Sequence, residues 1–373
     1  MSEPQYSYHC QRQAEGFARA ILPVPEDYPL REGMPEDFRP RFARLCALAK
    51  TIYLDMAKSP ESYGLMLVDI TSDDHNLARD GYRTIHRFVD TLSGLSRCGE
   101  LNGPQLVISL AAFRQAVKKG TGAVSGPVPK YELIFSRLTE FGFVFSGFTG
   151  KPYGRQVEAF AVEYPDDPGM MEAIKLYCAC WDSIKTDRGG VKVWPNEFHH
   201  HYYRFDYKIT ADLERIPVPQ WIADEAGYAG YSPELKGFSL AFYEHSLRYK
   251  GLQFDGDYNY KSKRVARIQQ AGYTAVGESA FHLSLKLRDL DRYMPEIEAM
   301  PESLRLPFTR SYCQYCNFQG ATMERCKFRL HWAYGGEEQD GCAYQCFCFN
   351  DFGLALVPAY WRLLELEYGL KRI

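Results

Sequence analysis

A polar stretch over residues 185–190, which ends in Gly189-Gly190, separates two differently patterned halves of this chain. Paired glycines beside charged residues are typical of linkers, because such a segment contributes little to a packed core. At 373 residues the chain also exceeds what one hydrophobic core usually serves. We therefore expect three segments: residues 1–75, residues 76–188 and residues 191–373.

The first segment carries the pattern of an amphipathic helix. Apolar residues recur there at steps of three and four, which places them on one helix face. These residues are Phe38, Phe42, Leu45, Leu48, Ala49 and Tyr53. Residues 1–75 are thus predicted to form a helical N-terminal extension that caps the second segment.

The second segment shows a more informative order of elements. Helical patterns at 82–92, 113–117 and 130–141 precede two apolar runs, 143–145 and 157–164, which a turn-rich stretch joins. Three helices followed by a β-hairpin is the order of a winged helix-turn-helix, with the hairpin as the wing. We therefore predict a winged-helix-like module with a trailing helix over 76–188. The alternative, an unrelated α+β arrangement with the same order, stays open.

Four basic residues of this segment are candidates for contacts with nucleic-acid phosphates: Lys130, Arg137, Lys151 and Arg155. They fall on the third helix and on the wing, and phosphate binding requires such a surplus of positive charge. The third helix, however, exposes residues of both signs, and the whole chain has a net charge of -3. Winged helices also serve as protein-contact modules, so a small molecule or a protein is the favoured partner and nucleic acid the less favoured one.

The third segment alternates between strand and helix patterns. Residues 235–249 and 361–368 read as helices, and residues 264–268 and 281–287 as strands. Residues 327–334 are expected to pair with 342–349 across Gly335-Gly336-Glu337. The expected fold class is therefore α+β, with a winged-helix-like module followed by an antiparallel-sheet α+β domain over 191–373.

Aromatic residues make up 15% of the chain. They serve either as packing surface or as the lining of a ligand pocket. Tyr258, Tyr260 and Trp332 are our candidates for ligand binding, and core packing is the alternative for each.

A cysteine cluster near the C-terminus is the sharpest local signal. Cys313 and Cys316 form a Cys-x2-Cys pair, and Cys326 and Cys342 flank the predicted hairpin. Tetrahedral zinc sites use four such thiolates, so we predict a structural zinc held by these residues. The alternative is a set of small buried side chains.

The compartment is indicated by what the sequence lacks. The N-terminal residues contain no apolar run of a secretory signal, and no stretch reaches the length that crosses a bilayer. Eleven cysteines, an odd number, fit a reducing cytoplasm without disulfides. We expect a cytoplasmic protein that does not span a membrane.

Two common reaction motifs, Gly-x-Ser-x-Gly and Gly-x4-Gly-Lys-Ser/Thr, are absent from the sequence. The chain resembles bacterial proteins of unknown function in residues 138–143 (LTEFGF), 281–293 (FHLSLKLRDLDRY) and 342–361. That resemblance implies no activity. We predict a binding protein of unknown specificity, in the form of a ligand-responsive regulator. Two alternatives stay open: a zinc-stabilised protein-interaction module, and an enzyme without a recognisable motif.

Overall fold

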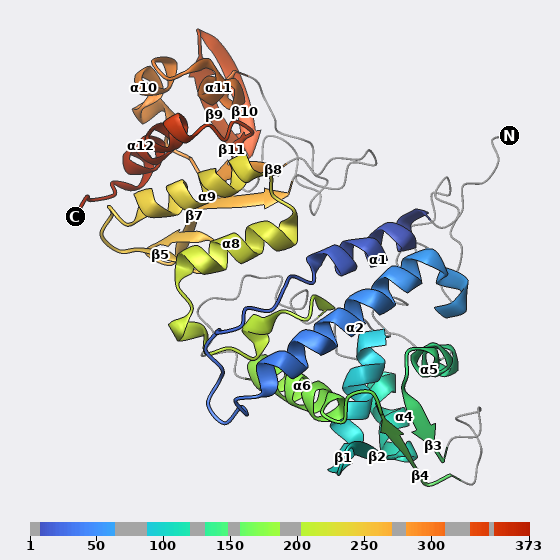
Figure 1. Ribbon diagram of the computed structural model, residues 1–373. Helices are drawn as coiled ribbons and strands as arrows, with labels where there is room; N and C mark the ends of the chain where they lie inside the picture. Colours follow the sequence, from blue (N-terminus) through green and yellow to red (C-terminus); the bar gives the residue numbers. More distant parts are fainter. Residues whose placement is uncertain are drawn as a thin grey trace, which may run out of the picture. The chain divides into compact units, whose positions relative to one another are not determined.

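The structure is a computed structural model, shown in Figure 1, that describes most of the chain in eight stretches. These are residues 8–63, 88–119, 131–147, 157–186, 203–270, 281–309, 329–342 and 347–373. The chain divides into two compact units. Unit 1 comprises residues 1–191, 196–217 and 227–229, and unit 2 the remainder.

Unit 1 is built on two long N-terminal helices, α1 (Tyr8–Ala20) and α2 (Phe38–Lys58), which pack against each other. Five of the six periodic apolar residues of α2 are buried and Leu48 is half-buried, which confirms the predicted helix face. A short 3-10 helix, η1 (Pro60–Tyr63), follows α2. The α2 face also packs on α6 (Met170–Thr186), where the rings of Phe42 and Tyr177 stack at 5.1 Å between centroids. The N-terminal helices therefore share a core with the segment predicted to be a separate module.

A four-stranded antiparallel sheet forms the other part of unit 1, in the order β1-β2-β4-β3. Residues 88–98 are helical and lead into it. The elements after this helix are β1 (Gly99–Asn102), β2 (Gln105–Ser109), α4 (Leu110–Lys119), α5 (Tyr131–Glu140), β3 (Val144–Ser146) and β4 (Ala159–Glu163). The predicted hairpin is confirmed, since Phe145 pairs with Val162. Strand β1 was not predicted, because only Gly99 of its four residues is buried and no alternation marks it.

Residues 203–217 return to unit 1, although the sequence pattern assigns them to the second domain. They carry η2 (Tyr207–Ile209) and η3 (Leu213–Arg215). Phe205 has a φ of 49°, unusual for a bulky side chain, and its ring stacks on Tyr177 at 5.4 Å. Asp206 and Lys208 are fully buried as an ion pair at 3.4 Å. The linker glycines Gly189 and Gly190 lie outside the described residues.

Unit 2 is organised around a five-stranded antiparallel sheet, in the order β11-β8-β7-β6-β5, and a two-stranded sheet, β10-β9. The helices, in chain order, are α8 (Val218–Ala229), α9 (Pro233–Ser246), η4 (Leu290–Arg292), α10 (Met294–Glu298), α11 (Glu302–Arg305), η5 (Leu306–Phe308), η7 (Leu354–Leu356) and α12 (Val357–Tyr368). The strands are β5 (Leu252–Phe254), β6 (Tyr258–Tyr260), β7 (Lys263–Gln270), β8 (Phe281–Leu285), β9 (Arg329–Tyr334), β10 (Glu337–Cys342) and β11 (Phe347–Phe349).

The core of unit 2 joins α9 and α12 to the inner face of the five-stranded sheet. Phe242 of α9 lies 4.6 Å from the ring of Trp361, whose indole N–H donates to the Phe242 carbonyl at 3.1 Å. Leu283 and Leu285 of β8 are fully buried, as their alternation predicted. Helix α9 begins at Ser232, whose hydroxyl accepts from the Leu235 amide at 3.2 Å.

One predicted pairing is wrong. Strand β9 pairs with Glu337–Cys342 rather than with residues 342–349. Gly335 and Gly336 both have positive φ, 59° and 85°, so the turn closes in two residues and the second arm begins at once. Strand β11 pairs instead with β8. Helices and antiparallel sheets occur together in both units, which confirms the α+β class.

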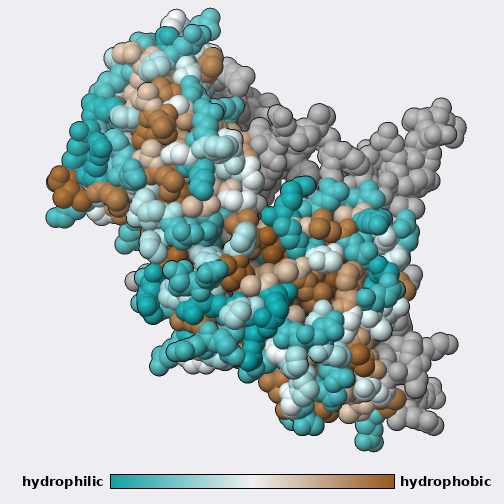
Figure 2. Space-filling model, in the orientation of Figure 1, coloured by the Kyte–Doolittle hydropathy of each residue, from teal (hydrophilic) through white to brown (hydrophobic). Residues whose placement is uncertain are grey.

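The described surface offers no single apolar patch in the view of Figure 2, where hydrophilic residues predominate and hydrophobic ones stand in small groups. The exposed large hydrophobic residues come from several elements and include Leu54, Leu101, Val144, Leu247 and Leu354. Within the described stretches, no helix combines the length and apolarity needed to cross a bilayer. On this face hydropathy does not single out a docking site, and the candidate sites are therefore sought in charge and geometry.

The aromatic packing between α5 and the hairpin gives a first prediction. Phe135 is 5% exposed and contacts Phe113, Phe145 and Phe160, so Phe135→Ala should destabilise unit 1 by about 3–5 kcal/mol. Val144→Ala, at a residue 41% exposed on the same hairpin, should change stability by less than about 0.5 kcal/mol. Denaturant unfolding of both variants checks this, and equal losses would contradict the packing described.

Candidate functional site

The surface formed by α5 and the β3–β4 hairpin is the first candidate site, because it carries the predicted nucleic-acid residues. Ile134, Phe135 and Leu138 of α5 are buried. Phe135 lies 4.6 Å from Phe145 of β3 and 6.2 Å from Phe160 of β4, measured between ring centroids. Helix α5 and strands β3 and β4 are therefore held together by this aromatic packing.

Arg137 of α5 has an intramolecular role. Its guanidinium donates to Asp55 of α2 and to Glu140, and it lies over the Tyr63 ring at 5.5 Å. The Tyr63 hydroxyl donates to the same Asp55 carboxylate at 2.6 Å. The hydrogen bond to Asp55 raises the pKa of Arg137 above its usual value. With 19% of its side chain exposed, Arg137 joins α5 to α2 and η1 and is not placed to contact phosphate.

The rest of the described α5 surface carries no positive charge. Its exposed residues are Ser136, Thr139 and Glu140, and the Thr139 hydroxyl donates to the Phe135 carbonyl at 2.9 Å. Lys130, Lys151 and Arg155 lie outside the described residues. Of the four predicted residues, the structure therefore describes Arg137 alone.

The three predicted ligand-binding aromatics do not form one site. Tyr258 is 3% exposed and packs among Phe242, Phe254 and Trp361, and this burial raises its pKa well above the usual value. The structure thus places Tyr258 in the core rather than in a pocket.

The other two aromatics lie apart from each other. Trp332 is 1% exposed and donates its indole N–H to the Phe308 carbonyl at 2.8 Å, so it is a core residue as well. Tyr260, on β6, is half-buried, and the Lys261 ammonium lies over its ring at 5.0 Å. Trp332 belongs to the separate β9–β10 sheet. Sequence reasoning could not separate these packing roles from binding, because large aromatics serve both.

Of the four predicted zinc ligands, the structure describes Cys342 alone. It ends β10, is half-buried, and pairs across the strand with Arg329. Cys313, Cys316 and Cys326 lie outside the described residues. Within the described stretches, no three His, Cys, Asp or Glu side chains group as metal ligands do. The zinc site stays a prediction.

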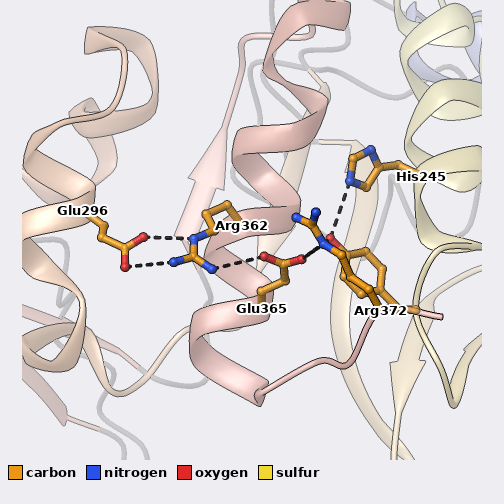
Figure 3. Close-up of polar contacts among 6 residues, drawn as sticks. His245, Glu296, Arg362, Glu365 and Arg372 are labelled. Carbon is orange, nitrogen blue, oxygen red and sulfur yellow. Dashed lines mark hydrogen bonds and ion pairs between the residues drawn. The ribbon is translucent and has the colours of Figure 1, made fainter.

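A connected charge network occupies unit 2 between α9, α10, α12 and the C-terminal residues (Figure 3). At its centre, the Glu365 carboxylate accepts from Arg372 at 2.6 Å, from the Tyr249 hydroxyl at 2.9 Å and from Arg362 at 3.3 Å. Arg362 also donates to both carboxylate oxygens of Glu296. Burial alone would raise the pKa of Glu365, but these donors hold it below the usual value.

His245 lies at the edge of this network. It is 8% exposed and stacks on Trp361 at 6.1 Å, and its Nε2 is 3.5 Å from the Tyr249 hydroxyl (Figure 3). Burial lowers its pKa, and the nearby Arg248 and Arg372 lower it further, against the opposing effect of Glu365. The network fixes the C-terminal residues to α9 and α12, where the Ile373 amide also donates to the Arg248 carbonyl at 2.8 Å. The members of this network are thus occupied with one another.

This network was not predicted from the sequence. A signal was available, because Arg362 and Glu365 are three residues apart on the predicted helix and such pairs face each other. The contributions of Tyr249 and Glu296, 116 and 66 residues away from their partners, arise only from the tertiary fold.

Comparison of the chain with protein-family models, with curated proteins and with solved structures finds no match. Function must therefore be inferred from the geometry described above.

A histidine whose pKa is lowered in the folded state binds fewer protons than in the unfolded chain. The free energy of unfolding is then at its full value above the ordinary histidine pKa of about 6.5, and it falls as the pH drops below that value. His245→Gln should accordingly reduce the loss of stability between about pH 6.5 and pH 5, as measured by denaturant midpoints. Burial also lowers the pKa of His282, so part of that loss should remain in the His245→Gln variant. An unchanged pH profile in His245→Gln would contradict this account.

Proposed function

We propose that this chain is a binding protein whose unit 1 carries a winged-helix-like module, and that the module contacts duplex nucleic acid through its wing. The strand order supports the module. The helix at 88–98, then β2, α4, α5 and the β3–β4 hairpin occur in winged-helix order, and β4 lies between β2 and β3. This order is the observation that carries the proposal. Strand β1 is an addition at the edge of the sheet.

The distribution of charge favours the wing over α5 as the contact element. Arg137 is engaged by Asp55 and Glu140, and the exposed residues described on α5 are neutral or acidic. Helix α5 is therefore poorly suited to enter a major groove, where base recognition relies on Arg, Lys, Asn and Gln. Lys151 and Arg155 fall between β3 and β4, and Lys130 immediately precedes α5. Contacts from these positions to phosphates would give binding with little sequence preference.

A salt titration with a random-sequence duplex tests the proposal. The double variant Lys151→Ala/Arg155→Ala should bind more weakly, and the slope of log affinity against log salt should fall by roughly 2, since each phosphate contact contributes about 0.9. The matched control is Arg292→Ala/Lys371→Ala, which removes the same charge from exposed positions of unit 2 and should leave the slope unchanged. Absence of salt-dependent binding by the unaltered chain would overturn the proposal and favour a protein partner for the module.

A structural zinc is a second proposal, and the register of the β9–β10 hairpin favours it. Cys342 is paired opposite Arg329, and Arg329 follows Cys326 by three residues in the sequence. Cys342 therefore stands where the chain enters the hairpin. Four thiolates there, Cys313, Cys316, Cys326 and Cys342, would satisfy a tetrahedral zinc and stabilise the sheet edge.

Elemental analysis of the purified protein should find one zinc per chain, and Cys313→Ser/Cys316→Ser should lose it. Cys348→Ser is the matched control, because Cys348 is exposed on β11 and outside the proposed set. Loss of zinc from the control, or an unaltered chain free of metal, would contradict the site.

A further inference from the structure

An open cavity of about 580 Å³ lies in unit 1, between the segment that joins α1 to α2 and residues near η3. Three arginines line it: Arg31 and Arg39 from the first segment, and Arg215 at the end of η3. Two acids, Asp27 and Glu36, complete the charged lining. Its volume is in the range of pockets that hold small ligands.

Backbone hydrogen bonds fix the two walls to each other. The Arg31 amide donates to the Thr210 carbonyl at 3.0 Å, and the Asp212 amide donates to the Pro29 carbonyl at 2.8 Å. Leu30 and Ala211 form an antiparallel bridge between these bonds. Asp212 also begins η3, so the position of Arg215 is tied to this bridge. The arginines therefore stand on a common frame, although about 180 residues separate the two walls in sequence.

Hydrogen bonds position the guanidinium groups of Arg39 and Arg31 without neutralising their charge, while the Arg215 side chain is exposed. Arg39 donates through Nε to the Tyr28 carbonyl at 2.7 Å and lies over the Tyr28 ring at 5.5 Å, and among the described residues nothing accepts from its two terminal nitrogens. Arg31 is directed by bonds to the Cys180 carbonyl and the Ser183 hydroxyl. Within the same described part, neither Asp27 nor Glu36 forms an ion pair with the three arginines. Paired guanidinium N–H groups that remain available match the geometry of an oxyanion.

We propose that this cavity binds a small molecule that carries a phosphate or carboxylate group, with Arg39 and Arg215 as its direct contacts and Arg31 as an added positive charge. The site goes beyond the nucleic-acid function and does not depend on it. It also assigns ligand recognition to unit 1 and not to the unit 2 aromatics that the sequence indicated.

Calorimetric titration of the full chain tests the site with two probes, inorganic pyrophosphate and citrate, which separate a phosphate preference from a carboxylate preference. Saturable binding of at least one probe is expected. Arg215→Ala should weaken it at least tenfold and leave the thermal midpoint of the ligand-free protein unchanged, because Arg215 is exposed. Arg215→Lys should restore only part of the affinity, since lysine lacks the paired donors.

The control Arg292→Ala removes an equal charge from an exposed position of unit 2 and should bind both probes normally. If neither probe binds saturably, or if Arg215→Ala binds as tightly as the unaltered chain, the proposal is overturned.

Discussion

The packing of four phenylalanine rings in unit 1 is the interaction on which the functional account depends. Phe113 of α4, Phe135 of α5, Phe145 of β3 and Phe160 of β4 meet at centroid distances between 4.6 and 6.2 Å. Together they hold two helices and the hairpin as one body. Without this cluster, strands β3 and β4 would lose their packing against α5.

Several charged residues of the described part of the chain are committed to the fold. Arg137 joins α5 to α2, the Asp206–Lys208 pair is fully buried, and Glu365 gathers donors from the end of α9, from α12 and from the C-terminal residues. A basic residue that is already bonded to a carboxylate must break that bond before it can bind phosphate, which reduces any gain. Arg39 of the unit 1 cavity differs, because its guanidinium is held by the Tyr28 carbonyl through Nε and, among the described residues, its two terminal nitrogens have no acceptor.

The sequence predicted buried side chains well where an element buries one face and exposes the other. The three- and four-residue spacing in α2 predicted most of its buried side chains, and the alternation in β8 predicted the burial of Leu283 and Leu285, although Ser284 between them is buried as well. It failed where burial depends on a distant partner. Arg137 looks exposed on a helical wheel but meets Asp55, 82 residues away, and Trp332 looks like a binding residue but donates to Phe308 in the core. Residues 203–217 belong to unit 1 for the same reason. Their rings pack on α2 and α6, a contact that exists only in the tertiary fold.

The most direct test of the central claim is hydrogen–deuterium exchange of the full chain with and without a short random-sequence duplex. Contact through the wing predicts slower exchange in residues 147–158 and at the start of α5, with exchange around Asp55 and Tyr63 unchanged because Arg137 keeps its intramolecular partners. Protection confined to unit 2, or none anywhere in residues 88–163, would contradict the account.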